Sequence, residues 1–406
     1  MAGTITRSQA VTAATPGVGN NIDGVGADRR PYSLDDKGVL NVLSSHSDPN
    51  ALRNAGFWFA QRQVPGTLTT YSNVGGRIIA GADGWGISCE NASIQYRRVD
   101  TSGAKDPNLQ SRFWGEYTKI TSTGKIAVCQ VVEGVDAQNF RGRTVRFQVY
   151  AKAIIGTPVA IKLGVMSWAG TLDTVPNGAG LMWSAFGANG VDPTLAANFS
   201  WLAPKSGVTP DNATASTNAA IGSATTTWQR FGVVVDVPDT CKNLIVVVWT
   251  DNQVIATNGI GLAQASLTEG YEVQDWSPAD YSRELARVQR FYAKTFEIDT
   301  GPVQNAGAAT GAIASIIGKA AATALASHIV WRYPVPLAKA ATTITQYSPE
   351  SAAAAPFRTT GTTPAIQTAS ATANSSSQGV VVTSTGDANG AVGDRVHVHL
   401  TADAEL

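Results

Sequence analysis

A series of short strand patterns, separated by turn residues, constrains the fold of this chain more than any other feature. Residues 144–153, TVRFQVYAKA, alternate apolar and polar side chains over ten positions, which predicts a half-buried antiparallel strand. Residues 243–249, NLIVVVW, form a nearly continuous apolar run that suits a central strand. Similar patterns occur at 56–59, 84–88, 94–96, 117–120, 126–132, 159–168, 228–237 and 260–267. No helical segments repeat between them, so we expect an all-β fold, an antiparallel sandwich or jelly roll.

The run from Leu267 to Phe296 closes this β-rich unit and opens another. Ser277 offers an N-cap hydroxyl, Pro278 fits the first helical position and Asp280 adds a carboxylate near the helix start. A linking helix of about four turns should therefore begin near Pro278. Apolar side chains then recur at spacings of three and four, at Leu285, Val288, Phe291 and Tyr292. We expect this stripe to pack against the sandwich, the following domain or a neighbouring subunit.

Several motifs in this region resemble those of virion proteins from tailed bacteriophages. At the junction they are DWSP at 275–278, EL at 284–285 and QRFYAK at 289–294. Within the sandwich they are FRGRTVRF at 140–147, Trp168, TTWQRF at 226–231, Val237-Pro238 and Asn243-Leu244. The resemblance covers roughly residues 52–296 and implies a carbohydrate-binding-module-like jelly roll followed by a smaller β domain. It says little about any ligand.

The pattern and the resemblance together give a plan of four parts. These are an extended N-terminal attachment arm at 1–50, the jelly-roll sandwich at 51–277, the linking helix at 278–296 and a C-terminal β domain at 297–406. The arm is rich in Gly, Ala, Thr, Asn and Asp, and a frayed terminus is the alternative to an attachment role. Residues 171–223 are too long for an ordinary jelly-roll connection, so we expect a functional loop or one packed on a neighbour.

The C-terminal region shows shorter strand patterns, at 329–333, 342–347, 379–383 and 395–400. In the last of these, His397 and His399 share one strand face, opposite Val396, Val398 and Leu400. Two such histidines could ligate a metal. No acidic or cysteine partner is implied by the sequence, so exposed strand histidines are the favoured interpretation and no cofactor is expected.

Composition excludes several classes of function. Charged residues make up 15% of the chain and the formal net charge is zero, which does not favour nucleic-acid binding. No segment approaches eighteen consecutive apolar residues and the first thirty lack a leader's apolar core, so neither membrane insertion nor Sec export is expected. Cys89, Cys129 and Cys241 lie far apart, which favours buried free thiols, with one disulfide as the alternative.

No catalytic motif stands out, and we expect no enzymatic activity. The sequence has no G-x-S-x-G elbow, phosphate loop, HExxH or Rossmann fingerprint. Glycoside hydrolysis by two carboxylates is the remaining enzymatic possibility. The candidate carboxylates are Glu116, Glu133, Asp136 and Asp173. Their spacing is uninformative.

Sugar binding is a better candidate, because nine of the ten tryptophans lie before residue 280. Trp183 and Trp201 lie in the long loop region and are the candidate glycan-binding residues; loop anchoring or subunit packing is the alternative. Tryptophans on or beside predicted strands are expected to fill the core or its rim, namely Trp58, Trp168, Trp228, Trp249 and Trp276.

The resemblance implies a structural protein of a tailed-bacteriophage virion, a tail or head fibre or appendage subunit on the particle surface. Its partners would be capsid, neck or tail proteins, contacted through the N-terminal arm. Fibre-like proteins of this kind are usually homotrimers, and several copies would contact host glycans with avidity. A dedicated receptor-binding protein is the alternative, and a glycan depolymerase a less favoured one.

Overall fold

The structure is a computed structural model, and it describes most of the chain. The described residues are 32–34, 40–42, 50–64, 66–71, 78–79, 81–90, 93–102, 106–107, 109–120, 123–176, 182–317, 319–320, 325–352, 354–358, 364–373, 375–385 and 391–405. Contacts divide the chain into two compact units, residues 1–50 and 51–406, which are described separately.

The first unit contains a short hairpin. β1 (Tyr32–Leu34) pairs antiparallel with β2 (Leu40–Val42), and Ser33 lies opposite Asn41. The rest of the expected N-terminal arm lies outside the described residues.

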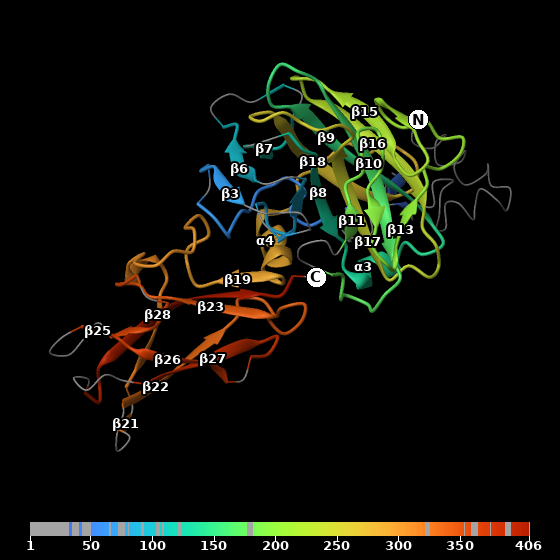
Figure 1. Cartoon of the computed structure of the whole chain (residues 1–406). Helices are drawn as coiled ribbons and strands as arrows, with labels where there is room; N and C mark the ends of the chain where they lie inside the picture. Colours follow the sequence, from blue (N-terminus) through green and yellow to red (C-terminus); the bar gives the residue numbers. More distant parts are fainter. Residues whose placement is uncertain are drawn as a thin grey trace, which may run out of the picture. The chain divides into compact units, whose positions relative to one another are not determined.

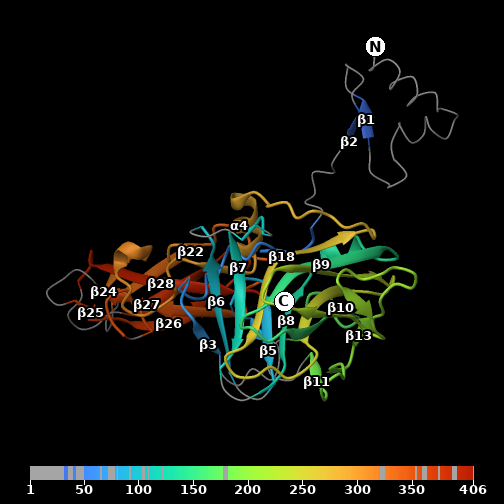
Figure 2. The same ribbon diagram turned by 90° about the horizontal axis from the view of Figure 1, so that it is seen from above.

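The second unit begins with an antiparallel sandwich of two sheets (Figures 1 and 2). The six-stranded sheet has the order β16-β9-β18-β7-β6-β3, and the eight-stranded sheet has the order β14-β15-β10-β17-β8-β5-β4, with β13 also paired to β10. The strands of the six-stranded sheet are β3 (Thr69–Tyr71), β6 (Ile94–Asp100), β7 (Phe113–Lys119), β9 (Thr144–Ala153), β16 (Gln229–Asp236) and β18 (Gly259–Glu269). Those of the other are β4 (Ile78–Ile79), β5 (Gly86–Cys89), β8 (Ile126–Val131), β10 (Val159–Trp168), β13 (Phe199–Leu202), β14 (Ala213–Ala215), β15 (Ala220–Ala224) and β17 (Asn243–Thr250). The expected jelly-roll sandwich is confirmed.

Both faces of the eight-stranded sheet are buried. Along β8, Ile126 and Val128 enter the main core between the sheets, whereas Ala127 and Cys129 belong to a second apolar cluster on the opposite face. Side chains in a strand alternate between the two faces, so the two clusters must lie on opposite sides of the sheet. The second cluster includes side chains from residues 171–223. This long connection therefore covers the sheet.

The connection from 171 to 223 is built from short strands. β11 (Trp183–Ala185) pairs with β12 (Thr194–Leu195), and β13, β14 and β15 extend the eight-stranded sheet. Two buried lysines, Lys125 just before β8 and Lys162 on β10, form polar contacts with this connection. Lys125 Nζ donates to the carbonyls of Phe186, Ala188 and Val191, at 3.3, 2.7 and 2.9 Å. Lys162 Nζ contacts the carboxylates of Asp192 and Asp251 at 2.7 and 2.8 Å.

The linking helix is shorter than expected and starts later. α4 spans Tyr281–Gln289, and its N-cap is Asp280, whose carboxylate accepts a hydrogen bond of 3.0 Å from the Arg283 amide. The expected cap at Ser277 was wrong, because an ionised carboxylate stabilises the positive end of the helix more strongly than a hydroxyl. Tyr292–Lys294, expected as helix, instead forms strand β19. α3 (Gly134–Gln138) follows β8. Among the described residues, no helix combines the length and apolar character needed to cross a membrane.

The C-terminal domain is built around one long strand. β28 (Arg395–Asp403) pairs along one edge with β19 and β20 (Ile313–Ile316), and along the other with β23 (Thr343–Tyr347) and β24 (Phe357–Arg358). A second sheet has the order β21-β22-β27-β26. The remaining elements are η1 (Ala308–Thr310), β21 (Lys319–Ala320), β22 (Leu325–Arg332), β25 (Ala365–Ile366), β26 (Thr368–Ala373) and β27 (Gly379–Thr385). A third apolar cluster, with Trp331, Val382 and Val398, forms its core.

Candidate functional site

The predicted packing stripe on the linking segment lies mostly in the interior. Val288, Phe291 and Tyr292 are buried, and Leu285 is half-buried. Phe291 joins the apolar cluster on the outer face of the eight-stranded sheet. Tyr292 lies on β19 in the C-terminal domain, opposite Asp403. The stripe thus divides between the two β domains within the second unit.

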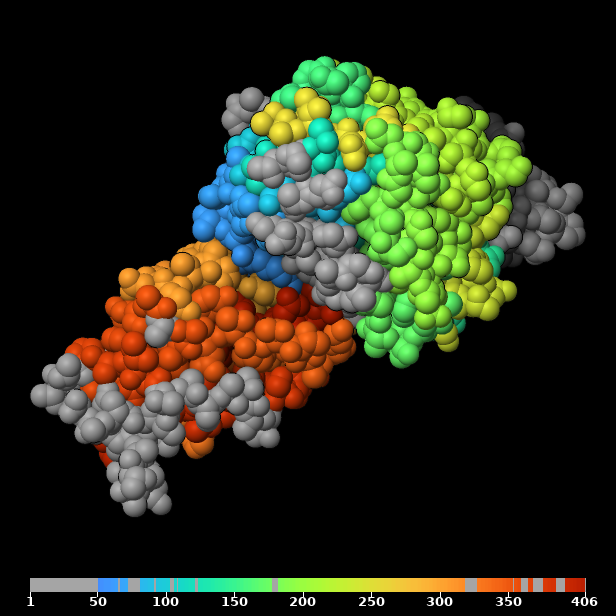
Figure 3. Space-filling view, viewed as in Figure 1, coloured from blue at the N-terminus to red at the C-terminus, as the bar shows by residue number. Residues whose placement is uncertain are grey.

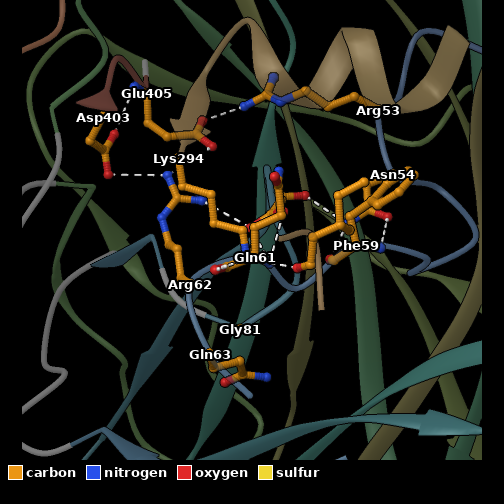
Figure 4. Close-up of polar contacts among 12 residues, drawn as sticks. Arg53, Asn54, Phe59, Gln61, Arg62, Gln63, Gly81, Lys294, Asp403 and Glu405 are labelled. Atoms are coloured by element: carbon orange, nitrogen blue, oxygen red, sulfur yellow. Dashed lines mark hydrogen bonds and ion pairs between the residues drawn. The ribbon is translucent and has the colours of Figure 1, made fainter. Parts of the chain in front are cut away.

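A group of mostly buried charged residues lies where these two domains meet (Figure 4). We call it the joint network, and it comprises Arg53, Arg62, Asp83, Lys294, Asp403 and Glu405. Three cations here face three carboxylates, so the group is balanced. In the space-filling view, the blue start of the sandwich abuts the orange and red C-terminal domain (Figure 3).

Two arginines from the start of the sandwich form ion pairs with Asp403, the last residue of β28, and with Glu405, which follows it. Arg53 forms an ion pair of 2.6 Å with Glu405. Arg62 contacts Asp83 at 3.2 Å, Asp403 at 3.1 Å and Glu405 at 3.5 Å. The two guanidinium groups also lie over the rings of Phe291 and Tyr292, at 3.8 and 4.0 Å from the ring centroids. Each arginine therefore binds both a carboxylate and an aromatic face.

Burial shifts the acid–base behaviour of the joint network. It raises the pKa of Asp83, against the attraction of Arg62. Burial alone would lower the pKa of Arg62, but the carboxylates of Asp403, Glu405 and Asp83 outweigh it and the pKa ends above its usual value. Burial lowers the pKa of Lys294 to about 8, although Asp83 opposes the shift. Lys294 Nζ donates to the carbonyls of Gln61, Ile298 and Thr300 at 3.1, 2.7 and 2.7 Å.

A small pocket lies beside the network, lined by Ala51, Arg53, Glu133, Asp136, Arg287, Arg290 and Phe291. Burial raises the pKa of both Glu133 and Asp136, against nearby arginines. Glu133 accepts two hydrogen bonds from Arg290, at 3.0 and 2.8 Å. A volume of about 30 Å³ suits water molecules rather than a sugar ring. The geometry is that of a structural ion pair.

The other carboxylates considered for hydrolysis are also held by neighbours. Glu116 accepts hydrogen bonds of 3.0 and 2.8 Å from Arg97. Asp173 accepts from the Gly134 amide at 2.7 Å and from Asn243 Nδ2 at 2.6 Å. Both carboxylates are therefore fixed by hydrogen bonds within the protein.

The two candidate glycan-binding tryptophans have different surroundings. Trp183 is 1% exposed and packs edge-on against Phe186, with 5.2 Å between the ring centroids. Trp201 is half-buried and stacks on Trp249 at 4.8 Å. Of the two predicted glycan-binding tryptophans, Trp201 therefore keeps part of its ring exposed to solvent.

A third aromatic group lies on the outer face of the six-stranded sheet. Trp114 and Trp228 meet edge to face at 5.3 Å, and Lys152 Nζ lies 4.5 and 5.0 Å from their rings. Burial lowers the pKa of Lys152, against the attraction of Asp106 and Glu116. Both indoles are buried. This group stabilises the sheet and offers no free ring.

An exposed aromatic surface lies near the start of α4. We call it the Tyr281 shelf, and it comprises Trp58, Tyr281 and Phe113 with the flanking ion pairs Arg112–Asp100 and Arg98–Asp299. Tyr281 is 49% exposed and stacks on Trp58 at 5.9 Å, while the buried Phe59 supports it at 5.1 Å. The guanidinium groups of Arg98 and Arg112 lie 4.6 and 4.9 Å from the Phe113 ring.

Sequence reasoning missed this shelf. It assigned Trp58 to the core or rim and gave no role to Tyr281. The residues come from the segment before β3, from β6 and β7, from α4 and from the loop after β19. One signal was present: Tyr281 directly follows the N-cap Asp280, a position that lies at the surface. The spacing in sequence does not reveal the other partners.

His399 and the three cysteines are buried. His399 is fully buried, which corrects the expectation of an exposed strand histidine, whereas His397 is half-buried. His399 stacks on Phe296 at 4.0 Å and contacts the hydroxyls of Thr295 and Thr310 at 3.2 and 3.1 Å. All three cysteines are buried thiols, and the structure shows no disulfide bond between them. Within the part of the chain that the structure describes, no three His, Cys, Asp or Glu side chains gather closely enough to hold a metal ion.

Comparison with known proteins gives similarity of fold only. No family model and no curated protein matches the chain significantly. Similar solved structures include the CBM22-1 and GH10 modules of Clostridium thermocellum xylanase 10B with xylohexaose, at 12% identity over 46% of this chain and 26% of that one, TM-score 0.27. The enzymatically active domain of bacteriophage CBA120 tailspike protein 4 matches at 11% identity over 55% and 22%, TM-score 0.27. TmCBM61 in complex with β-1,4-galactotriose matches at 12% identity over 54% and 99%, TM-score 0.27.

Several of these neighbours are carbohydrate-binding modules with a β-sandwich fold. The matched part spans about a quarter of the length of the first two structures. Fold does not define function, so the ligand has to be argued from this chain's own side chains.

Proposed function

We propose that this chain is a non-enzymatic appendage subunit of a tailed-bacteriophage virion, held by its N-terminal arm and contacting host-surface glycans. The observation that carries the proposal is the division of the chain. Residues 1–50 form their own unit, whereas residues 51–406 form one unit. Buried ion pairs fasten the two β domains of that second unit to each other. Such a division suits an anchor and a projecting body.

The resemblance at the junction and in the sandwich supports the assignment to a virion, where the partners would be capsid, neck or tail proteins. A homotrimer on the particle surface would multiply a weak glycan contact by avidity. The balanced charge of the chain and the absence of a sugar-sized cleft around Glu133 and Asp136 support a binding role over hydrolysis.

Removal of residues 1–50 tests the anchor. We expect the remaining chain, residues 51–406, to fold, because it forms one compact unit that contains the three large apolar clusters of the described residues. Phage assembled with the truncated subunit should lack it, as measured by quantitative mass spectrometry of purified particles. The Trp201→Ala variant, with the arm intact, serves as the control and should be incorporated normally. Normal incorporation of the truncated chain would contradict the role of the arm.

A further inference from the structure

The Tyr281 shelf presents a pre-positioned aromatic ring. Tyr281 is supported from below by Trp58 and Phe59, and about half of its surface remains open. A tyrosine fixed in this way loses little conformational freedom when a ligand stacks on it. An aromatic face of this kind suits the apolar C–H face of a pyranose ring.

Hydroxyl-binding groups lie within the shelf: Arg98 and Asp299 act electrostatically on Tyr281, and the Arg112–Asp100 pair lies at Phe113. The Asp100 carboxylate accepts hydrogen bonds of 3.0 and 2.7 Å from exposed Arg112. The Asp299 carboxylate accepts one of 3.1 Å from Arg98. A carboxylate has about four acceptor positions and a guanidinium five donors, so both pairs keep capacity for a ligand. A sugar hydroxyl donates and accepts, and an adjacent Asp and Arg can satisfy both roles.

We propose that the Tyr281 shelf is a binding site for a neutral saccharide, an inference that rests on the glycan contact proposed above. The two guanidinium groups and two carboxylates cancel, so the shelf offers no excess positive charge to a uronic or sialic acid. A second protein chain fits less well, because three partly exposed rings are a small part of the roughly 800 Å² per partner that stable interfaces bury.

The experiment uses the full chain and a matched pair of tyrosines. Binding is first surveyed on an array of neutral and acidic host-surface oligosaccharides, and the affinity for the strongest neutral binder is then measured by titration calorimetry. Tyr281→Ala should weaken binding about tenfold, whereas Tyr281→Phe should keep most of it. Tyr271→Ala is the control, because Tyr271 is 53% exposed and is not part of the shelf. Asp100→Asn should also weaken binding.

The outcomes separate the site from the function. Glycan binding that Tyr281→Ala and Asp100→Asn leave unchanged would overturn the shelf but not the proposed glycan contact. If the unmodified chain binds no oligosaccharide on the array, both proposals fail. Binding of acidic sugars alone would overturn the neutral assignment. If Tyr281→Ala keeps normal affinity but changes the number of subunits in the oligomer, measured as its mass in solution, the shelf is a subunit contact and the saccharide site is overturned. Unfolding temperatures close to that of the unmodified chain confirm that the variants are folded.

Discussion

His399 illustrates how single residues in this protein depend on burial. Burial lowers the pKa of His399, and a hydrogen bond to the Gly307 carbonyl opposes the shift only in part. The neutral ring lies flat against Phe296. Sequence reasoning placed His399 on the strand face opposite Val398 and favoured an exposed ring, because it could not show that Thr310 of η1 contacts this histidine.

This histidine should make stability depend on pH. In the unfolded chain it takes up a proton near pH 6.5, whereas in the folded chain its pKa lies lower. The unfolded state therefore binds more protons as the pH falls below about 6.5, and stability decreases. Thermal unfolding between pH 7.5 and 5 should show this loss for the unmodified chain and a weaker one for His399→Gln.

His328→Gln is the matched control, because His328 is exposed on β22. Its pH profile should follow that of the unmodified chain. Half-buried His397 also has a lowered pKa from burial and contributes part of the remaining slope. Equal slopes for His399→Gln and the unmodified chain would contradict the prediction.

At the scale of elements, periodicity predicted the strands well and the turns poorly. β9 and β10 span the predicted residues 144–153 and 159–168. The apolar stretch at 56–59 was expected as a strand, but Gly56 ends a turn at 53–56 and residues 57–59 have no regular secondary structure. Asn54 and Phe57 adopt positive φ angles of 50° and 56°, and Asn54 Oδ1 accepts from the Phe59 amide at 3.0 Å. These positive φ angles are maintained by tertiary contacts, so they cannot be predicted from the propensities of single residues.

The start of α4 gives a direct test of local structure. Asp280→Ala should destabilise the protein by about 1 kcal/mol, because the Arg283 amide loses its acceptor. Ser277→Ala, at the position that the sequence favoured, should change stability by less than about 0.5 kcal/mol. Urea unfolding of the two variants and of the unmodified chain measures both changes in the free energy of unfolding. Equal effects of the two substitutions would show that Asp280 is not the operative cap.

For the molecule beyond the arm, the joint network links the two β domains. Its partners lie far apart in sequence: Arg53 and Glu405 are separated by 352 positions. The sequence analysis predicted a packing joint from the apolar stripe, of which Val288, Phe291 and Tyr292 are buried and Leu285 is half-buried. It could not predict the ion pairs, since charged residues at such distances show no pattern.

Two carboxylates of the network allow a matched comparison. Glu405→Gln removes one charge from a site where its side chain is 2% exposed, and leaves Arg53 with a buried, uncompensated charge. We expect a loss of about 3 kcal/mol and, on heating, separate unfolding of the two domains. Asp403→Asn, at a side chain that is 33% exposed, should cost less than about 1 kcal/mol and keep one transition. Differential scanning calorimetry measures both. A single unchanged transition in Glu405→Gln would show that apolar contacts alone couple the domains.

The long separation within the joint network also sets an order of events during synthesis. At about 5–20 residues per second, the ribosome needs about 18–70 s to reach Glu405 after adding Arg53. During that time Arg53 and Arg62 lack their carboxylate partners from β28 and stay hydrated. The sandwich strands can pair meanwhile, because all of them precede residue 270. The complete joint network can therefore form only after residue 405 has been synthesised.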